Sequence, residues 1–364
     1  MSTASNMSAT RVVPVIARSA GTPVVLIALV GLVTILGWYI LPVARQFALT
    51  EMLVMVVIAV GISIFTSNTG IISFGHIGFV CIGAYATAWM TCDPMWKRMM
   101  LHDLPWFLAD EKYPPILAIV LSGGWAAAIA GIVGAAILRL SGIAAAIATF
   151  AFLMIVSSVY SNWNDLTAGT SSIINVPTFV TPPVAAGFAA AAIVIGCLFR
   201  VSRAGLMLRA SSDDMVAAQA SAIPVVRLRL AAFVLSAFVA GCGGAIYAHF
   251  VGILSPDNFY LNMTFVTLAM VVIGGINSLS GAVVGVIIVT LVIQALRQLE
   301  AGVPIASGVK LPNGSQEVGL AIAWIAFLIF RPRGIMGGTE LGLPQRLWKR
   351  TKPPAVELST TNTT

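Results

Sequence analysis

Few residues in this 364-residue sequence have side chains that could carry acid–base, nucleophilic or metal chemistry, and they are widely scattered. The chain holds only three histidines, the residue type best suited to proton transfer at neutral pH. Neither the histidines nor the four cysteines have the spacing of a metal site or a CxxC motif. We therefore expect no metal centre and no catalytic cluster, and we interpret the cysteines as small apolar residues. The residues concerned are His76, His102, His249, Cys81, Cys92, Cys197 and Cys242.

Charged residues are almost absent from the long apolar runs. Glu51 and Glu317 fall at the ends of runs, and Asp165 and Asp257 fall between runs. Secondary transporters driven by protons or sodium usually carry carboxylates or lysines at membrane depth. An ion-coupled secondary transporter of a small organic solute is therefore the disfavoured alternative, and uptake abolished by an ionophore would revive it. If this chain moves a solute, we expect another subunit to supply the work.

The elements that position these residues must be membrane helices, because the composition excludes a soluble domain. The chain is 59% hydrophobic and 9% charged, with a mean hydropathy of +0.97, whereas soluble domains carry about 25% charged residues. The apolar runs are continuous, not alternating, which predicts helices and not a barrel. We expect an all-α integral membrane protein with about ten transmembrane helices, some of them short or interrupted. The candidate spans are 23–42, 50–66, 72–91, 115–138, 142–160, 183–200, 229–251, 262–275, 281–297 and 317–331, of which 262–275 and 281–297 are either two short spans or one broken element.

The net charge of +7 is interpreted as a sign of topology and not of nucleic-acid binding. With the N terminus inside and every span crossing, most of the 20 lysines and arginines fall on the inside, which is typical of cytoplasmic loops. We therefore expect both termini in the cytoplasm. The chain divides into a cytoplasmic N-terminal segment, 1–22, a transmembrane domain, 23–337, and a cytoplasmic tail, 338–364, whose polar, Thr-rich composition predicts disorder.

One apolar stretch, residues 67–90, also contains glycines, serines and a histidine. Gly75, Gly78 and Gly83 let helices approach closely, so close helix packing is one interpretation. The other is an interrupted helix whose main chain lines a solute path and offers free N–H groups to a carboxylate. The polarity of His76 predicts that it faces the protein interior, as a structural histidine more than as a solute ligand.

The largest segment predicted on the inside, residues 200–229, is a candidate docking site for a partner subunit. Ser211 or Ser212 can cap a helix whose first turn holds two aspartates, where carboxylates interact favourably with the helix dipole. The stretch "DDMVAAQASA" then predicts a short exposed helix, which Pro224 ends. The alternative is an ordinary cytoplasmic connector that carries positive-inside charges.

Five stretches of the sequence resemble the membrane permeases of branched-chain amino-acid ABC importers. Residues 205–223 are similar to that family's ATPase-docking loop, "GxxLRAIxxxExAAExxGI", and residues 73–85 to its "SLGHAAFxGIGAY". Residues 232–259 resemble its "AFxxSAxxAGxAGALYAxxxGxxSPxxF", residues 270–286 its "MVVxGGxGSLxGPxxGA", and residues 329–337 its "xFxPxGLxG". The matches run in order over most of the chain, which is far more specific than any single motif.

The sequence departs from the family pattern at several places. In the docking loop Met215 and Gln219 stand where Glu is common, and Ala222 stands where Gly is common. Asp214 lies beside the first of these positions and can replace its charge. In a segment predicted outside, residues 166–172 read "LTAGTSS" where the family tends to "LTGGxxG", which leaves the identity of the solute open.

The resemblance implies a permease subunit of an ABC importer that moves amino acids, branched-chain or otherwise apolar, across the bacterial inner membrane. Urea, amides and aromatic acids are the alternatives within the same group. The implied partners are a second homologous permease, two ATP-binding subunits, a solute-binding protein outside and membrane lipid, with no nucleic acid. The chain itself is expected to be no enzyme and to hold no cofactor, because the partner subunits bind ATP.

The resemblance also implies two sets of site residues. One set forms a wall of the solute path, and the other couples the chain to the ATPase. Closure of the ATPase pair would move the docking loop and rock the helices between inward and outward states. The path residues are Ser73, Gly75, His76, Gly78, Gly83 and Tyr85, and the coupling residues are Gly205, Arg209, Asp214, Ala217, Ala218 and Ala222.

Overall fold

The computed structural model describes residues 4–140, 142–300, 314–331 and 334–341. These residues form helices joined by mostly short connections, and their only β-type pairing is an isolated bridge between Ile173 and Leu254. The predicted all-α class is confirmed. The long helices are α1 (Ala4–Ile40), α2 (Val43–Thr69), α3 (His76–Thr91), α6 (Pro115–Ile137), α7 (Ile143–Asn162), α9 (Pro182–Val201), α12 (Val225–Val251), α13 (Leu261–Gly274), α14 (Leu279–Glu300) and α15 (Ser315–Phe330). The short ones are α4 (Pro94–Met100), α5 (Trp106–Ala109), α8 (Asn164–Thr167), α10 (Arg203–Asp213), α11 (Met215–Ala220) and the 3₁₀ turn η1 (Pro256–Phe259).

Each predicted span corresponds to one long helix. In the described ranges, eight helical stretches are long and apolar enough to cross a membrane, so the chain is a multi-pass membrane protein. The other two predicted spans correspond to α3 and α15, which have 16 residues each and are shorter than the ~20 residues of a straight span. Helix α1 begins at Ala4, so most of the predicted N-terminal segment is part of the first helix. Nearly all of the predicted tail, residues 342–364, lies outside the described residues.

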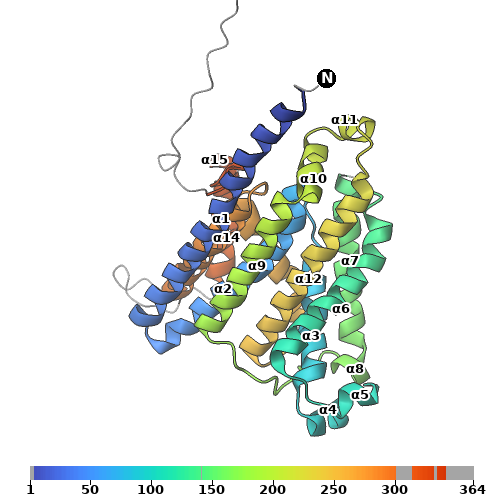
Figure 1. Ribbon diagram of the computed structural model, residues 1–364. Coiled ribbons are helices and arrows are strands. Elements are labelled where there is room, and N and C mark those ends of the chain that lie inside the picture. The colour runs from blue at the N-terminus through green and yellow to red at the C-terminus, as the bar shows by residue number, and fades with distance from the viewer. Residues whose placement is uncertain (1–3, 141, 301–313, 332–333, 342–364) are drawn as a thin grey trace, which may run out of the picture.

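The helices run between two opposite faces of the molecule (Figure 1). We name them the α10 face, which carries α10, α11 and the start of α1, and the α4 face, which carries α4, α5 and α8. The last described segment, 334–341, lies on the α10 face, since Ile335 N donates to Ile273 O near the end of α13 at 2.9 Å. The described chain thus begins and ends on the same face. That this face is cytoplasmic stays a prediction.

Helix α12 lies at the centre of the bundle and packs against α2, α3 and α6. Its contact with α3 depends on glycines, because a Cβ atom at Gly83 would overlap the main chain of Gly241, and one at Gly244 would overlap that of Val80. Small residues permit such close approach between membrane helices. Every residue of α3 except Met90 is buried, so this short helix is enclosed by its neighbours and has little contact with lipid.

Two breaks in the helices lie on the α10 face. Residues 70–75 separate α2 from α3 and begin with Gly70 at φ +70°. Residues 275–278 separate α13 from α14 and begin with Gly275 at φ +127°. These backbone angles favour glycine. The stretch around residues 274–281, which the sequence left as two spans or one broken span, is a junction between two separate helices.

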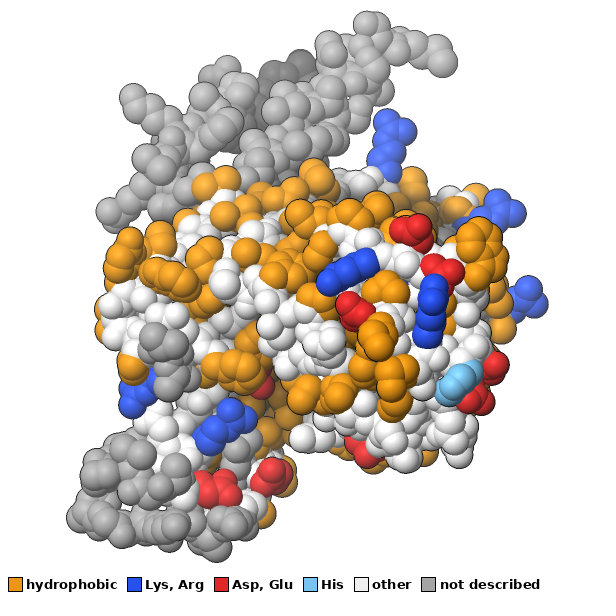
Figure 2. All heavy atoms as spheres, turned by 90° about the horizontal axis from the view of Figure 1, so that it is seen from below, with side chains coloured by type: hydrophobic (Ala, Val, Ile, Leu, Met, Phe, Trp, Pro, Cys, Tyr) orange, Lys and Arg blue, Asp and Glu red, His pale blue; other side chains and the backbone are white. Residues whose placement is uncertain are grey.

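The α4 face is covered by short helices and irregular segments. Figure 2 shows acidic and basic side chains and a histidine scattered among hydrophobic ones on this face. Arg98 and Asp110 form an exposed ion pair at 2.7 Å. Ile173 and Leu254 exchange two main-chain hydrogen bonds of 2.8 Å, which attach the segment before α9 to the end of α12. This face is therefore covered by short helices and connecting segments and not by spanning helices.

Candidate functional site

His76, at the start of α3, is the centre of a buried polar cluster. Its Nδ1 lies 2.7 Å from Ser73 Oγ, and its Nε2 lies 2.6 Å from Ser236 Oγ of α12. Ser236 Oγ donates in turn to Gly61 O of α2 at 2.6 Å. Because that hydroxyl proton is used, His76 Nε2 must be the donor to Ser236, and neutral Nδ1 accepts from Ser73. The predicted path residues Ser73 and His76 are thus brought together, and both ring nitrogens are occupied.

Three phenylalanines surround the same imidazole ring. The ring centroids of Phe65, Phe79 and Phe233 lie 5.7, 6.1 and 5.4 Å from that of His76, and His76 itself is 1% exposed. An apolar enclosure of this kind excludes water and leaves no open approach for a solute. The geometry supports a structural histidine that joins α2, α3 and α12 near the helix break.

The predicted glycines lie at helix crossings. Gly75 faces the main chain of Thr149 in α7, and a Cβ atom at Gly78 would lie 3.1 Å from the ring of Phe152 in the same helix. Gly83 faces α12 at Gly241. The main-chain amide of Phe74 is not available to a ligand, since it donates to Thr149 Oγ1 at 3.2 Å. These contacts support the packing interpretation of the glycines within this chain.

Tyr85 differs from the other predicted path residues. Its side chain is fully buried, its ring packs edge-on against Tyr160 with centroids 4.9 Å apart, and its hydroxyl has no hydrogen-bond partner. Buried polar atoms are nearly always bonded. Of the six predicted path residues, Tyr85 is therefore the one whose polar group still lacks a partner such as a water or a solute atom.

His249, near the end of α12, is completely buried. Its Nδ1 donates to Pro177 O at 2.8 Å, and Thr87 Oγ1 of α3 lies 3.0 Å from its Nε2. His102 is exposed and lies 3.8 Å from Asp165. The three histidines are thus separate, and no group of three or more His, Cys, Asp or Glu residues that could hold a metal occurs in the described ranges.

The segment between α9 and α12 contains two helices, where the sequence predicted one. Ser202 caps α10 by accepting from Gly205 N at 3.2 Å. The cap of α11 is Asp214, which accepts from Val216 N and Ala217 N at 2.9 and 3.0 Å. The predicted caps Ser211 and Ser212 are wrong, because both residues lie inside α10. Their hydroxyls donate to carbonyls of the preceding turn.

The predicted coupling residues are spread over this segment. A Cβ atom at Gly205 would overlap Phe199 O, so glycine permits the tight corner between α9 and α10. Ala217 is exposed and Ala218 is buried. Ala222 has φ +57°, a left-handed angle that explains why the family commonly has Gly there. Asp214 and Ala217 are joined by the capping bond described above.

Apolar side chains project from α10 and α11 that the sequence analysis did not single out. Val216 is 77% exposed, and Leu206 and Met207 are 42% and 41% exposed. On a short polar segment outside the membrane spans, exposed apolar residues indicate a surface for a partner. The apolar residues on both sides of the polar run in "GLMLRASSDDMV" (205–216) were the available sequence signal.

Arg209 fixes α10 to the helical bundle. Its Nη1 donates to Arg200 O at the end of α9 at 2.9 Å and to Asn68 Oδ1 at the end of α2 at 3.2 Å. Burial lowers the pKa of the Arg209 guanidinium, and the nearby charge of Arg200 lowers it further, while Glu340 raises it. The α10–α11 segment is therefore attached directly to the helix that precedes the first break.

Lys97 of α4 occupies a comparable position on the opposite face. It is completely buried, and its Nζ donates to Trp89 O at 3.2 Å, to Glu111 O at 2.7 Å and to Leu108 O. Burial lowers the pKa of this ammonium, and nearby acidic groups oppose the shift. Trp89 and Leu108 lie in the last turns of α3 and α5, where free carbonyls favour a cation.

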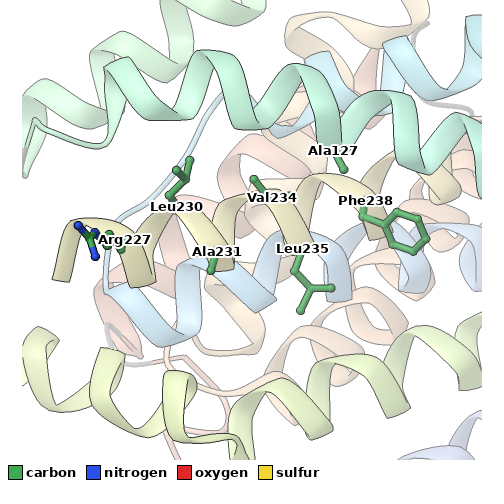
Figure 3. A pocket seen from close by; sticks show the side chains of 7 residues that line it. All are labelled: Ala127, Arg227, Leu230, Ala231, Val234, Leu235 and Phe238. Carbon is green, nitrogen blue, oxygen red and sulfur yellow. The ribbon is translucent and has the colours of Figure 1, made fainter. Parts of the chain in front are cut away.

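A groove on the side of the bundle offers no site for a charged solute. Figure 3 shows that its residues come mainly from α12, with Ala127 from α6. The groove has a volume of about 550 Å³, and only Arg227, at the end nearest α11, is polar. A zwitterion would lose its hydration there without replacement hydrogen bonds. The groove lining is the surface expected of a helix that faces lipid or another apolar surface.

Comparisons with known proteins give consistent matches. A family model described as "Branched-chain amino acid transport system / permease component" matches residues 45–330. The high-affinity branched-chain amino acid transport system permease protein LivM of Escherichia coli (strain K12) is 22% identical over 325 residues, which cover 80% of this chain and 69% of LivM. The corresponding protein LivH of the same strain is 26% identical over 307 residues, which cover 78% of this chain and 91% of LivH. No solved structure matches significantly.

Proposed function

The chain belongs to the family of permease components of branched-chain amino acid transport systems, and we propose that it is the membrane permease of an ATP-binding-cassette importer. The observation that carries the proposal is the α10–α11 segment. It presents Val216 to solvent and is tied through Arg209 to the end of α2, next to a helix break. A partner that moves this segment would therefore act on the spanning helices.

The mechanism requires no bond chemistry in this chain. Two ATP-binding subunits would bind the α10 face, and their closure on ATP would displace α10 and α11. The movement would pass to the ends of α2 and α9, and rock the helices between inward-open and outward-open states. ATP would be held by those partners, so this chain would need no cofactor and no catalytic residue.

The remaining partners follow from the same mechanism. A single permease chain offers one wall of a path, so we propose a second permease of similar fold in the bacterial inner membrane. LivM and LivH are both named as permease proteins of one kind of transport system, which supports a pair of different chains. A soluble binding protein would deliver solute to the α4 face, where charges of both signs are exposed (Figure 2).

The proposed solute is an apolar amino acid, with branched-chain residues first. The support is the family description and the two relatives. Within this chain, α3 is the proposed wall of the path near Tyr85, since His76 and the glycines of residues 70–85 are enclosed by neighbouring helices. Tyr85 is the proposed polar contact, because its hydroxyl is buried without a partner. Leucine, urea, an amide and an aromatic acid can be compared as substrates of the same preparation.

The test is ATP-dependent uptake by the assembled transporter in proteoliposomes, with Val216→Glu as the variant. A buried charge at the interface would prevent docking of the ATPase, so we expect uptake of radiolabelled leucine to fall at least tenfold. Binding of leucine to the soluble receptor should be unaltered. The matched control, Val216→Ala, should retain most uptake. Uptake that needs no ATPase and collapses with an ionophore would overturn the proposal in favour of an ion-coupled transporter.

A further inference from the structure

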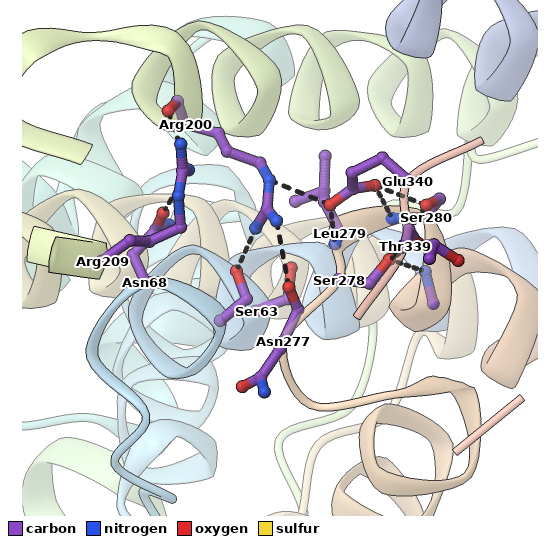
Figure 4. A network of polar contacts seen from close by, with 12 residues as sticks. Ser63, Asn68, Arg200, Arg209, Asn277, Ser278, Leu279, Ser280, Thr339 and Glu340 are labelled. Carbon is purple, nitrogen blue, oxygen red and sulfur yellow. Dashed lines mark hydrogen bonds and ion pairs between the residues drawn. The ribbon is translucent and has the colours of Figure 1, made fainter. Parts of the chain in front are cut away.

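Arg200, in the last turn of α9, connects three separate parts of the chain (Figure 4). Its Nε lies 2.9 Å from Glu340 Oε1 in the C-terminal segment. Its Nη2 donates to Asn277 O in the α13–α14 break at 3.0 Å, and its Nη1 donates to Ser67 Oγ near the end of α2 at 3.3 Å. The Arg200 guanidinium therefore contacts the end of α2, beside the first break, and the main chain of the second break.

Glu340 binds the start of α14 with the same carboxylate. Its Oε1 accepts from Leu279 N at 2.8 Å, and its Oε2 accepts from Ser280 N at 3.0 Å and from the Ser280 hydroxyl. Free amides at a helix start favour an anion. Glu340 thus caps α14 and neutralises Arg200 at once. The sequence analysis placed this residue in a disordered tail, but residues 338–341 lie against α14.

The main chain around Glu340 is also held across the second break. Met336 N donates to Gly274 O at 3.0 Å, and Ser278 Oγ donates to Thr339 O at 2.9 Å. Leu341 N donates to Ser280 Oγ at 3.1 Å. The C-terminal segment therefore crosses from the end of α13 to the start of α14 and bonds to both.

The α10–α11 segment connects to the same network through Arg209. Arg209 of α10 donates to Arg200 O, so any displacement of α10 acts on the residue whose side chain holds Glu340. The side chains of Arg200 and Glu340 are only 15% and 20% exposed. Little solvent screens the pair, so its geometry is strongly favoured over separated charges.

We propose that the Arg200–Glu340 ion pair transmits movement of α10 to both helix breaks, which makes Arg200 and Glu340 positioning residues for transport. The inference rests on the proposed function, because it assumes that an ATPase moves α10. With the pair intact, α9, the end of α2 and the start of α14 move together. Without the pair, α10 moves but α14 no longer follows.

The first experiment measures leucine uptake and ATP hydrolysis on the same reconstituted transporter, with Arg200→Gln and Glu340→Gln in this chain. Glu340→Gln keeps one acceptor oxygen for the α14 amides, so it tests the ion pair if Arg200→Gln fails to assemble. We expect uptake to fall at least tenfold while hydrolysis stays within about twofold of the wild type. The ATP consumed per solute would then rise at least about fivefold. Arg139→Gln, which removes an exposed positive charge after α6 on the same face, is the matched control and should alter neither rate.

The second experiment measures hydrogen exchange on the purified permease chain, without partners. If the pair links α10 to α14, Glu340→Gln should accelerate amide exchange in both residues 203–213 and residues 277–283. This measurement does not depend on transport, so it stands even if the wild type shows no ATP-dependent uptake and the proposed function fails.

Three outcomes would overturn the inference. In the first, both variants transport normally. In the second, uptake and hydrolysis fall in parallel, which would indicate lost assembly and not lost transmission. In the third, exchange accelerates only in residues 277–283, which would make Glu340 a local cap for α14.

Discussion

Two cations on opposite faces of the molecule, Lys97 completely buried and Arg200 mostly buried, bind their partners in different ways. Lys97, on the α4 face, bonds to three main-chain carbonyls that lie 8, 11 and 14 residues away in the sequence. Arg200, on the α10 face, bonds to Asn277 and Ser67, which lie 77 and 133 residues away, and to the carboxylate of Glu340. The lysine closes one local unit, whereas the arginine joins distant ones.

The difference indicates what each face can do. Carbonyls at helix ends cannot leave Lys97 unless α3, α4 and α5 come apart, so the α4 face is fixed by its own fold. The partners of Arg200 sit on α2, the α13–α14 break and the C-terminal segment, which are separate elements. A junction between separate elements can rearrange without unfolding any one of them. The predictions below test this contrast in order of expected effect.

Lys97→Met should have the largest effect on stability. It leaves the carbonyls of Trp89, Leu108 and Glu111 without this donor, and each unsatisfied buried polar group costs about 1–3 kcal/mol. We expect a loss of about 3 kcal/mol or more in the free energy of unfolding, measured by thermal unfolding in detergent. Lys112→Met, which removes an exposed lysine of the same face, is the control. Equal melting temperatures for the two variants would contradict a fixed α4 face.

Arg200→Met should destabilise the protein less, by about 1–2 kcal/mol. Glu340 would keep the amides of Leu279 and Ser280 as partners, so the carboxylate is not left alone. The same thermal unfolding assay measures the effect, and leucine uptake should fall far more than stability does. If Arg200→Met were as destabilising as Lys97→Met, the α10 face would be as fixed as the α4 face.

Ala168→Gly and Ala222→Gly form a matched pair across the two faces. Both alanines have left-handed angles, φ +60° and φ +57°, which cost an L-residue about 1 kcal/mol. Each substitution should therefore stabilise the protein by up to about 1 kcal/mol. Ala222 follows the docking helix, so we expect only Ala222→Gly to change the uptake rate as well. If only Ala168→Gly changed the uptake rate, the α4 face and not the α10 face would be the one linked to transport.

Asp110→Asn should have the smallest effect. It breaks the ion pair with Arg98, whose side chains are 66% and 47% exposed, and exposed pairs contribute about 0–1 kcal/mol. We expect less than about 0.5 kcal/mol in the unfolding assay. A larger loss would show that the α4 face also depends on charge pairing.

The sequence predicted the spanning helices well because each one is an uninterrupted apolar run. The break before α3 was also foreseeable, since Gly70 and Gly75 bracket it. The cap of α11 was not, because Ser211, Ser212 and Asp214 are all good capping residues. The choice depends on where α10 ends. Arg209 anchors α10 through a bond to Asn68, 141 residues away, that leaves no local pattern.

The buried charges were the least predictable part of the candidate site. Lys97 sits in a polar stretch with other charged residues, so its composition indicates a solvated loop. Glu340 follows the last recognisable motif, so it was assigned to the tail. Lys97 is completely buried and Glu340 is 20% exposed because several separate elements converge on each of these side chains. Neither local composition nor residue spacing predicts that convergence.

Helices α3 and α12 exchange equivalent bonds near the two ends of α3. On the α10 side a histidine of α3, His76, meets a hydroxyl of α12, and on the α4 side a histidine of α12, His249, meets a hydroxyl of α3. Two helices bonded at two separated points resist sliding along and rotating about one another. The α3–α12 pair is thus expected to move as one unit, and the other helices would move relative to it.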